Sequence, residues 1–189
     1  MDEINKSWLK GELNFYFRFK RKFIESRIKG SCLNVGCGSH IIRNAVNIDE
    51  GAENLPYKEN SFDTVILSDV IEHIKEWGKV IDEAIRVSRK KVIITAPAYK
   101  WLWSNYDKLL KHYIRYERSD IDSALKNYKN IRYNIRYLFG PTLPLFFLRK
   151  FTAGRTPKLP RLVDNILYAI SHIRLPFGST IVVEIEKIN

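Results

Sequence analysis

The chain of 189 residues, 45% hydrophobic and 28% charged, has the size and composition of a single folded domain. Its two cysteines, Cys32 and Cys37, have no second pair and no histidine nearby, which excludes a disulfide framework and a zinc ribbon and leads us to predict no metal site and a reducing, cytoplasmic environment. The net charge of +11 arises in residues 1–29, 99–136 and 140–175, and it fits nucleic acid, an anionic membrane surface or an anionic substrate without choosing among them.

The amino-terminal segment, residues 1–29, places aromatic and aliphatic side chains among basic ones. This pattern predicts an amphipathic helix of about five turns, broken near Gly11. The segment has no uninterrupted apolar core, so we expect no signal peptide. Three roles stay open for it: a lid over a bound ligand, attachment to a membrane surface as a peripheral protein, or RNA binding.

Strand and helix patterns alternate along residues 30–138. Apolar runs at residues 31–35, 46–48, 62–67 and 91–95 indicate strands, and residues 77–88 repeat apolar side chains at helical spacing. This alternation predicts an α/β fold with a doubly wound, mostly parallel sheet.

The remaining segments complete one expected domain, residues 1–189. We expect strands at residues 131–138 and 181–188, and a helix over 161–172 with Leu162, Ile166, Leu167 and Ile170 facing inward. The apolar stretch 137–148 is too short to span a membrane, which takes about 20 residues. The domain would comprise the amino-terminal helix (1–29), a ligand-binding core (30–138), a helical cap (139–175) and a final strand (176–189).

A candidate binding site follows the first two predicted strands. Gly36-Cys37-Gly38 comes directly after the first strand, and Asp49 ends the second. Ligands of doubly wound sheets bind at the carboxyl ends of the strands, where glycines admit the ligand and a carboxylate can accept two ribose hydroxyls. The pattern therefore indicates a nucleoside-bearing cofactor. A nicotinamide fingerprint would need a third glycine where Ile41 stands, and no P-loop is present.

Several ordered motifs carry a resemblance to a known family. They are LNVGCG at 33–38, VNID at 46–49, NSFDTV at 60–65, SDVIEH at 68–73, WLW at 101–103, HYIRY at 112–116 and PFGST at 176–180. Together they resemble the class I S-adenosylmethionine-dependent methyltransferases, most closely the type 11 small-molecule and lipid methyltransferases. The resemblance implies a Rossmann-like fold, S-adenosylmethionine as cofactor and methyl transfer to a small or lipid-linked acceptor.

The resemblance also assigns expected roles to individual residues. On the cofactor side, Gly36 and Gly38 would pass under the methionine moiety, Asp49 would hold the ribose, and Ala52 would contact adenine through its backbone. Ser68 and Asp69 would lie near the sulfonium, Cys37 fills the glycine loop, and Asn34 stands where many relatives have an acidic residue. The substrate region would include Trp101, Trp103, Tyr106, Arg115 and Tyr116, and the candidate general bases are His73 and His112.

The chain departs from the family pattern in its short connections. About nine residues separate the first two strands, fewer than the dozen that a helical crossover needs. We therefore predict that the first helix is reduced to a turn or two and that one edge strand of the usual seven is missing, leaving six. The adenine side would then be open unless the amino-terminal segment or a second subunit, as in a homodimer, covers it.

Two other functions stay open. The charge suggests an RNA methyltransferase, although the strand that ends at Ser68-Asp69 lacks the Asn/Asp-Pro-Pro-Tyr/Phe motif seen in many nucleic-acid amino-methyltransferases. The trimmed crossovers, Asn34 and His40 would also fit a degenerate fold that serves as a partner-binding module.

Overall fold

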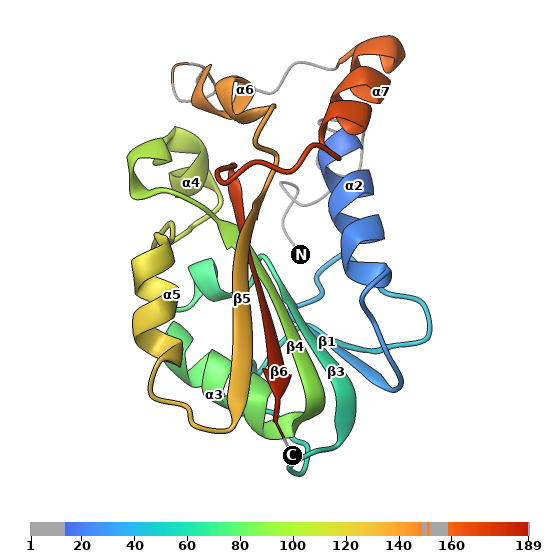
Figure 1. Ribbon diagram of the computed structural model, residues 1–189, viewed down its shortest axis with the longest axis vertical. Coiled ribbons are helices and arrows are strands. Elements are labelled where there is room, and N and C mark those ends of the chain that lie inside the picture. Colours follow the sequence, from blue (N-terminus) through green and yellow to red (C-terminus); the bar gives the residue numbers. More distant parts are fainter. Residues whose placement is uncertain (1–13, 149–150, 152–158, 189) are drawn as a thin grey trace.

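The computed structural model describes residues 14–148, 151 and 159–188. Its centre is one six-stranded sheet with the order β2-β1-β3-β4-β6-β5, flanked by helices (Figure 1). The strands β2, β1, β3 and β4 are parallel, and β6 is antiparallel to both of its neighbours. The predicted α/β class and the six strands are confirmed.

The elements follow the predicted order. The strands are β1 (Cys32–Val35), β2 (Val46–Ile48), β3 (Phe62–Ser68), β4 (Ser88–Pro97), β5 (Ile131–Leu138) and β6 (Thr180–Lys187). The α-helices are α2 (Asn14–Glu25), α3 (Trp77–Val87), α4 (Asn105–Leu109), α5 (Arg118–Leu125), α6 (Leu143–Leu148) and α7 (Arg161–Ile170). Two short 3₁₀ helices, η1 (Ile71–His73) and η2 (Lys100–Leu102), follow β3 and β4.

The central strands β1, β3 and β4 bury most of both faces, as their continuous apolar runs predict. Val65 and Leu67 of β3 join a core with Ile81 of α3 and Ile121 of α5 on one side of the sheet. The intervening Ile66 packs on the opposite side, in a cluster that contains Ile24 of α2. This period of two along β3 places α3 and α5 on one face and α2 on the other.

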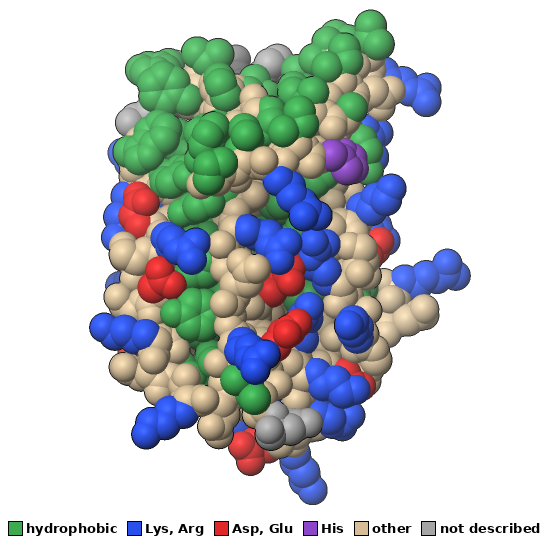
Figure 2. Space-filling view, viewed as in Figure 1, with side chains coloured by type: hydrophobic (Ala, Val, Ile, Leu, Met, Phe, Trp, Pro, Cys, Tyr) green, Lys and Arg blue, Asp and Glu red, His purple; other side chains and the backbone are tan. Residues whose placement is uncertain are grey.

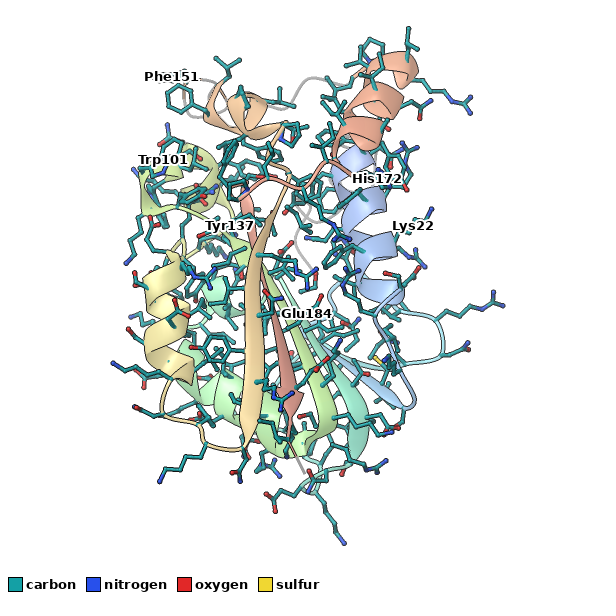
Figure 3. The ribbon with its side chains drawn as sticks, in the orientation of Figure 1. Lys22, Trp101, Tyr137, Phe151, His172 and Glu184 are labelled. Carbon is teal, nitrogen blue, oxygen red and sulfur yellow. The ribbon has the colours of Figure 1, made fainter. Side chains whose placement is uncertain are left out.

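Charged side chains, rather than a helix, cover the part of the α2 face that β5 and β6 form, as far as the described residues extend (Figures 1 and 3). Glu184, labelled in the middle of this face, pairs with Arg27 at 2.5 Å, Arg136 at 3.6 Å and Lys91 at 3.7 Å. The long stems of these basic residues cover the sheet while their charges stay near Glu184. This face of the molecule is therefore polar at its centre (Figure 2).

The length of the connection from β1 to β2 predicts a helix reduced to a turn or two, and the structure has no helix there. Residues 36–45 form turns, and β2 is the edge strand next to β1. The chain then returns to the other side of β1 to form β3. The order of the strands reverses at β1, and this reversal opens a crevice beyond its carboxyl end.

The helices α2 and α7 differ in how well they match the sequence-based expectations. The described part of the amino-terminal segment is helical from Asn14 to Glu25, and the predicted break near Gly11 lies outside the described residues. In α7, Leu162 and Ile166 are 72% and 52% exposed, so the expectation that both face inward was wrong. The reason is that α7 packs mainly against α2, through contacts such as Tyr168 with Phe19, rather than lying flat on the sheet.

Candidate active site

The turn after β1 brings the backbone close to neighbouring elements. Gly36 and Gly38 have φ angles of +63° and +46°, in the left-handed region that favours glycine. A Cβ atom on Gly36 would lie 2.7 Å from Cγ2 of Val70. The turn is tied to β2 because the Cys37 N–H donates to the Ile48 carbonyl at 3.0 Å. Only glycine fits at position 36, and the turn leaves its backbone facing the crevice.

Asp49 stabilises the same turn from the end of β2. Its Oδ1 atom accepts a hydrogen bond from the Gly38 N–H at 2.7 Å. The side chain is on the surface of the crevice and stands where a carboxylate can reach hydroxyl groups of a ligand. The loop and the carboxylate are therefore held in place relative to each other before any ligand arrives.

At the end of β3, Asp69 lies at the floor of the crevice. Its φ angle is +55°, and its carboxylate forms an ion pair with the Lys20 ammonium from α2. The Lys20 side chain is 3% exposed. Burial disfavours the charge on Asp69, but the Lys20 ammonium outweighs it and holds the pKa of Asp69 below its ordinary value. The amino-terminal helix thus contributes directly to the crevice.

Two imidazoles and a carboxyl group meet beyond Asp69. Glu72 and His73 belong to η1, and His112 follows α4; the rings of His73 and His112 are 4.7 Å apart. Glu72 is 1% exposed, and its Oε2 atom has no hydrogen-bond partner among the residues that the structure describes. Burial, reinforced by the charge of Asp69, raises the pKa of Glu72 well above its ordinary value. Burial and the nearby His112 lower the pKa of His73.

Asp107 positions the His112 imidazole. Its Oδ1 atom lies 3.0 Å from Nδ1 of His112 and 2.8 Å from Nε of Arg115. Asp107 also accepts from the Ser104 N–H at 2.9 Å, as part of the capping box that starts α4. Burial would raise the pKa of Asp107, but the hydrogen bonds from His112 and Arg115 lower it to about 2. An ionised carboxylate only accepts, so Nδ1 of His112 carries the proton and Nε2 is left for another partner.

Most of these groups line one cavity of about 700 Å³, whereas Lys20 lines a second cavity and Asp107 is buried behind His112. One end is formed by the loops after β1 and β2 and the end of β3, with Gly36, Cys37, Gly38, Asp49, Ala52, Ser68 and Asp69. The other end is formed by η1, α4 and α6, with Glu72, His73, Tyr106, Leu109, His112, Arg115 and Phe146. The cavity therefore joins a loop-and-carboxylate end to an aromatic-and-imidazole end.

Four of the predicted site residues are not part of this lining. Asn34 borders a second cavity of about 510 Å³ under α2, and its amide donates to the His40 carbonyl and to Asn47, each at 2.9 Å. Trp101 is 49% exposed and stacks on Tyr99, with ring centres 5.7 Å apart (Figure 3). Trp103 is half-buried, and Tyr116 is fully buried with its hydroxyl donating to the Ile71 carbonyl at 2.9 Å. The roles predicted for them stay predictions.

Lys20 and Asp107 belong to the site although the sequence analysis assigned them no part in it. Lys20 acts through Asp69, which is 49 positions away in the sequence, and Asp107 acts through His112, five positions later. A signal for Lys20 was available, because it stands four residues after Tyr16 and next to Phe19, so a cation lies on the inward side of an apolar helix face. Such a cation needs a buried partner.

Comparisons with known proteins agree with this geometry. Residues 39–95 match a family model described as a methyltransferase domain. Among curated protein sequences, none matches the chain. Solved structures resemble the chain at low sequence identity, and this likeness shows a shared fold.

Three of these structures illustrate the likeness. A possible histamine N-methyltransferase from Thermotoga maritima is 14% identical, with a TM-score of 0.60, covering 93% of this chain and 91% of that one. A putative methyltransferase in complex with the Trm112 activator from Haloferax volcanii is 11% identical, with a TM-score of 0.60, covering 98% and 93%. Phosphoethanolamine N-methyltransferase 2 from Haemonchus contortus, in complex with S-adenosyl-L-methionine, is 15% identical, with a TM-score of 0.57, covering 90% and 52%. The family match and the shared fold confirm the resemblance that the motifs indicated.

Proposed function

We propose that this chain, an S-adenosylmethionine-dependent methyltransferase of the class I fold, methylates a small or lipid-linked acceptor with an apolar body. The observation that carries the proposal is the single cavity with two chemically different ends. The end at the β1 and β2 loops suits a nucleoside with an amino-acid tail. The end at η1, α4 and α6 suits an apolar molecule that carries one nucleophilic atom.

The residues present fit S-adenosylmethionine. The Gly36 turn leaves no room for a side chain, since a Cβ there would meet Val70, so the backbone itself faces the ligand. Asp49 keeps one carboxylate oxygen on the Gly38 N–H and stands at the wall of the cavity, where its second oxygen can accept from ribose hydroxyls. We assign Gly36, Gly38 and Asp49 to cofactor binding, with Ala52, Ser68 and Asp69 beside them.

When bound, S-adenosylmethionine supplies a methyl group on a positively charged sulfur; its transfer to an acceptor lone pair releases S-adenosylhomocysteine, and a hydroxyl or ammonium acceptor also loses one proton. The methyl group is already activated, so the protein contributes mainly by holding the two reactants in line. Ser68 and Asp69 line the same cavity as both sets of residues, so the two reactants would meet beside them.

The acceptor end supports an apolar substrate. Leu109 and Phe146 line it together with Tyr106, and the ring of Phe146 packs on Tyr16 of α2 at 5.6 Å. We place His73 and His112 at the reacting atom of the acceptor, because both line this end of the cavity. Arg115 is already held by Asp107 and by the Ala98 carbonyl at 3.1 Å, so it shapes the wall.

The surface around the acceptor end supports a lipid-linked substrate. Exposed apolar side chains gather over α6, α7 and η2, at the upper end of the molecule in Figure 2. Phe147 and Leu148 of α6 are 40% and 59% exposed, immediately after the cavity residue Phe146. An acceptor with a long apolar tail could leave the cavity along this surface.

The cofactor assignment is tested by calorimetric titration with S-adenosylhomocysteine. We expect micromolar binding by the wild-type protein and a loss of about tenfold or more in Asp49→Ala, because a hydrogen bond to a charged group contributes about 1.5–3 kcal/mol. Glu50→Ala is the matched control, since Glu50 is exposed and does not line the cavity. A folded wild-type protein that binds neither S-adenosylmethionine nor its product would refute the enzyme and favour the partner-binding module.

The acceptor class is tested with labelled methyl groups. Transfer into a lipid extract or an apolar small-molecule pool, enhanced by detergent or vesicles, is the expected result. Transfer into RNA, falling steeply with added salt as phosphate contacts are lost, would favour the RNA alternative instead.

A further inference from the structure

Three metal-ligating side chains converge at the acceptor end of the cavity. Each of Glu72, His73 and His112 offers one ligand atom, and these three atoms lie within 4.8 Å of one another. Two of the three groups are held away from solvent, since Glu72 is 1% exposed and the His112 side chain 7%. His73 stands on the open side, toward the cavity. The three groups can therefore approach one point inside the cavity.

The His112 imidazole is oriented by an acceptor behind it. The Asp107 carboxylate receives Nδ1–H of His112, which leaves the Nε2 lone pair of that ring unused. The His73 ring lies beside it, with ring centres 4.7 Å apart, and lines the cavity. A carboxylate or carbonyl behind a ligating imidazole is the arrangement that fixes the tautomer and raises the basicity of metal-bound histidines.

The carboxyl group of Glu72 supplies the second, independent observation. Its buried Oε2 atom has no hydrogen-bond partner in the described part of the chain, a condition that native structures rarely leave without a reason. The backbone carbonyl of Glu72 accepts from the Tyr113 N–H at 2.7 Å. This bond ties the His112 loop to η1, so the three side chains are held together by the fold and not by chance proximity.

We propose that Glu72, His73 and His112 bind a divalent transition-metal cation, such as Zn²⁺, Co²⁺ or Mn²⁺, at the acceptor end of the cavity. Two imidazoles and one carboxylate suit these cations, and three protein ligands leave coordination positions open. The open positions would face the cavity, where the acceptor is placed.

The inference rests on the proposed function and narrows its substrate class. A cation in this position would take an oxygen of the acceptor and favour its ionised form, as metal ions do for bound water. The acceptor would then be a hydroxyl- or enol-bearing molecule, and its proton would leave to solvent before the new bond to the methyl carbon forms. The two imidazoles would act as ligands and not as the general bases that the sequence analysis expected.

The sequence did not predict this site because its ligands are not closely spaced. His112 stands 40 positions after Glu72, and tertiary contacts such as the Tyr113–Glu72 backbone bond bring the two segments together. The expectation of no metal site rested on the two cysteines, which lie on β1 and its following turn. The cation site proposed here uses neither of them.

The test is a titration of the chelator-treated full chain with Co²⁺, followed by visible absorption and by thermal melting. We expect one Co²⁺ per chain, a spectrum of nitrogen and oxygen ligation without a thiolate charge-transfer band, and a raised melting temperature that a chelator reverses. Glu72→Gln and His73→Ala should each weaken binding by at least tenfold. His172→Ala is the matched control, since it removes an exposed imidazole on another face and should leave binding unchanged.

Each outcome bears on a distinct conclusion. Absence of Co²⁺ binding by the folded wild-type chain, or wild-type affinity in both Glu72→Gln and His73→Ala, would overturn the metal site and return His73 and His112 to the role of bases. S-adenosylhomocysteine titrations on the same chelator-treated samples keep the two proposals separate. Product binding without Co²⁺ binding refutes only the metal site, whereas absence of product binding refutes the proposed function.

Discussion

The ion pair between Lys20 and Asp69 connects the amino-terminal helix to the end of β3. Lys20 is nearly buried, and its ammonium also lies 4.8 Å from the centre of the Tyr16 ring. Asp69 has a φ angle of +55° in the turn into η1, and its Oδ1 atom also accepts a hydrogen bond from the Thr95 hydroxyl at 3.2 Å. The pair fixes the floor of the cavity at the point where its two ends meet.

We predict that Lys20→Met lowers the free energy of unfolding by about 1–3 kcal/mol, because it leaves the Asp69 carboxylate without its charged partner. The double variant Lys20→Met/Asp69→Asn should recover much of this loss. Urea unfolding followed by circular dichroism measures both. A double variant that is as unstable as the sum of the single variants would contradict the ion-pair explanation.

The effect should depend on pH. The pKa of Asp69 is lowered in the folded state, so the stabilisation it gives is complete above the ordinary aspartate pKa of about 3.9 and is lost as pH falls through the lowered value. In Lys20→Met the lowering effect of the ammonium is gone and burial raises the pKa of Asp69. The difference in stability between wild type and Lys20→Met should therefore begin to shrink as pH falls through the raised pKa of the variant, and it should be smallest below the lowered pKa of the wild type. A difference that stayed constant from neutral to acid pH would assign the effect to another group.

At this scale, the residues that the sequence predicted are those whose role is local. Gly36 and Asp49 follow strands directly, and their positions at the carboxyl edge follow from the strand pattern alone. Lys20 and Asp69 are 49 positions apart, and no local pattern pairs them. The orientation of His112 likewise depends on Asp107, whose own place is set by the capping box of α4.

Among the elements, α2 depends on α7 for its position. The Phe15 N–H donates to Oδ1 of Asp164 at 2.6 Å, and Arg18 lies 3.3 Å from the second oxygen of the same carboxylate. The N–H groups in the first turn of a helix have no partner within the helix, so a carboxylate from α7 satisfies one of them. In this way α7 holds the helix that carries Lys20 to the cavity.

We predict that Asp164→Ala costs about 1–2 kcal/mol of stability, as the loss of a helix cap does, and speeds amide exchange in α2 more than in the sheet. Hydrogen exchange resolved by mass spectrometry makes the comparison. Asp122→Ala is the control, because the partly exposed Asp122 carboxylate on α5 interacts with Arg118 and Tyr133 and not with α2, so amide exchange in α2 should stay unchanged. Unchanged exchange in α2 would show that Asp164 does not anchor it.

The helices and strands also show which structural features can be predicted from sequence patterns alone. Connection lengths predicted a shortened helix between β1 and β2, where the structure has none, and the absent seventh strand, because a crossover has a minimum length that does not depend on packing partners. Periodicity gave the extent of α7 but not its inward face, because α7 packs on α2 and leaves Leu162 and Ile166 exposed. A helical pattern says which side chains share a face, but the tertiary structure decides what covers that face.

Across the whole molecule, apolar and charged surfaces are separated. The apolar end comprises exposed side chains of η2, α6, α7 and the residue Phe151, namely Trp101, Phe147, Leu148, Phe151, Leu162, Val163 and Ile166. Lys and Arg side chains are spread over the remaining surface in view (Figure 2). No helix in the described residues is long and apolar enough to cross a bilayer. Apolar surface beside cationic residues such as Arg161 and Arg174, in a chain of net charge +11, is the pattern of a face that lies on an anionic membrane.

We predict that the full chain sediments with vesicles that contain phosphatidylglycerol and far less with vesicles of phosphatidylcholine alone. Binding should weaken with added salt, because the basic contribution is screened. Leu162→Gln/Ile166→Gln should reduce the partition coefficient by tenfold or more, since each side chain gives up about 1.5–3 kcal/mol of burial in the bilayer. Both residues are exposed, so the double variant should fold normally.

Ile188→Gln provides the matched comparison, because Ile188 is 43% exposed but lies beside the carboxyl terminus, at the end of the molecule opposite α7 (Figure 1). Equal losses in the two variants would mean that binding is not confined to the apolar end. Absence of sedimentation with anionic vesicles would exclude the membrane, and the apolar end would then have to serve the acceptor itself. If Ile188→Gln still sediments with the vesicles and Leu162→Gln/Ile166→Gln does not, the acceptor end of the cavity lies at the bilayer surface, where a lipid-linked acceptor can enter it.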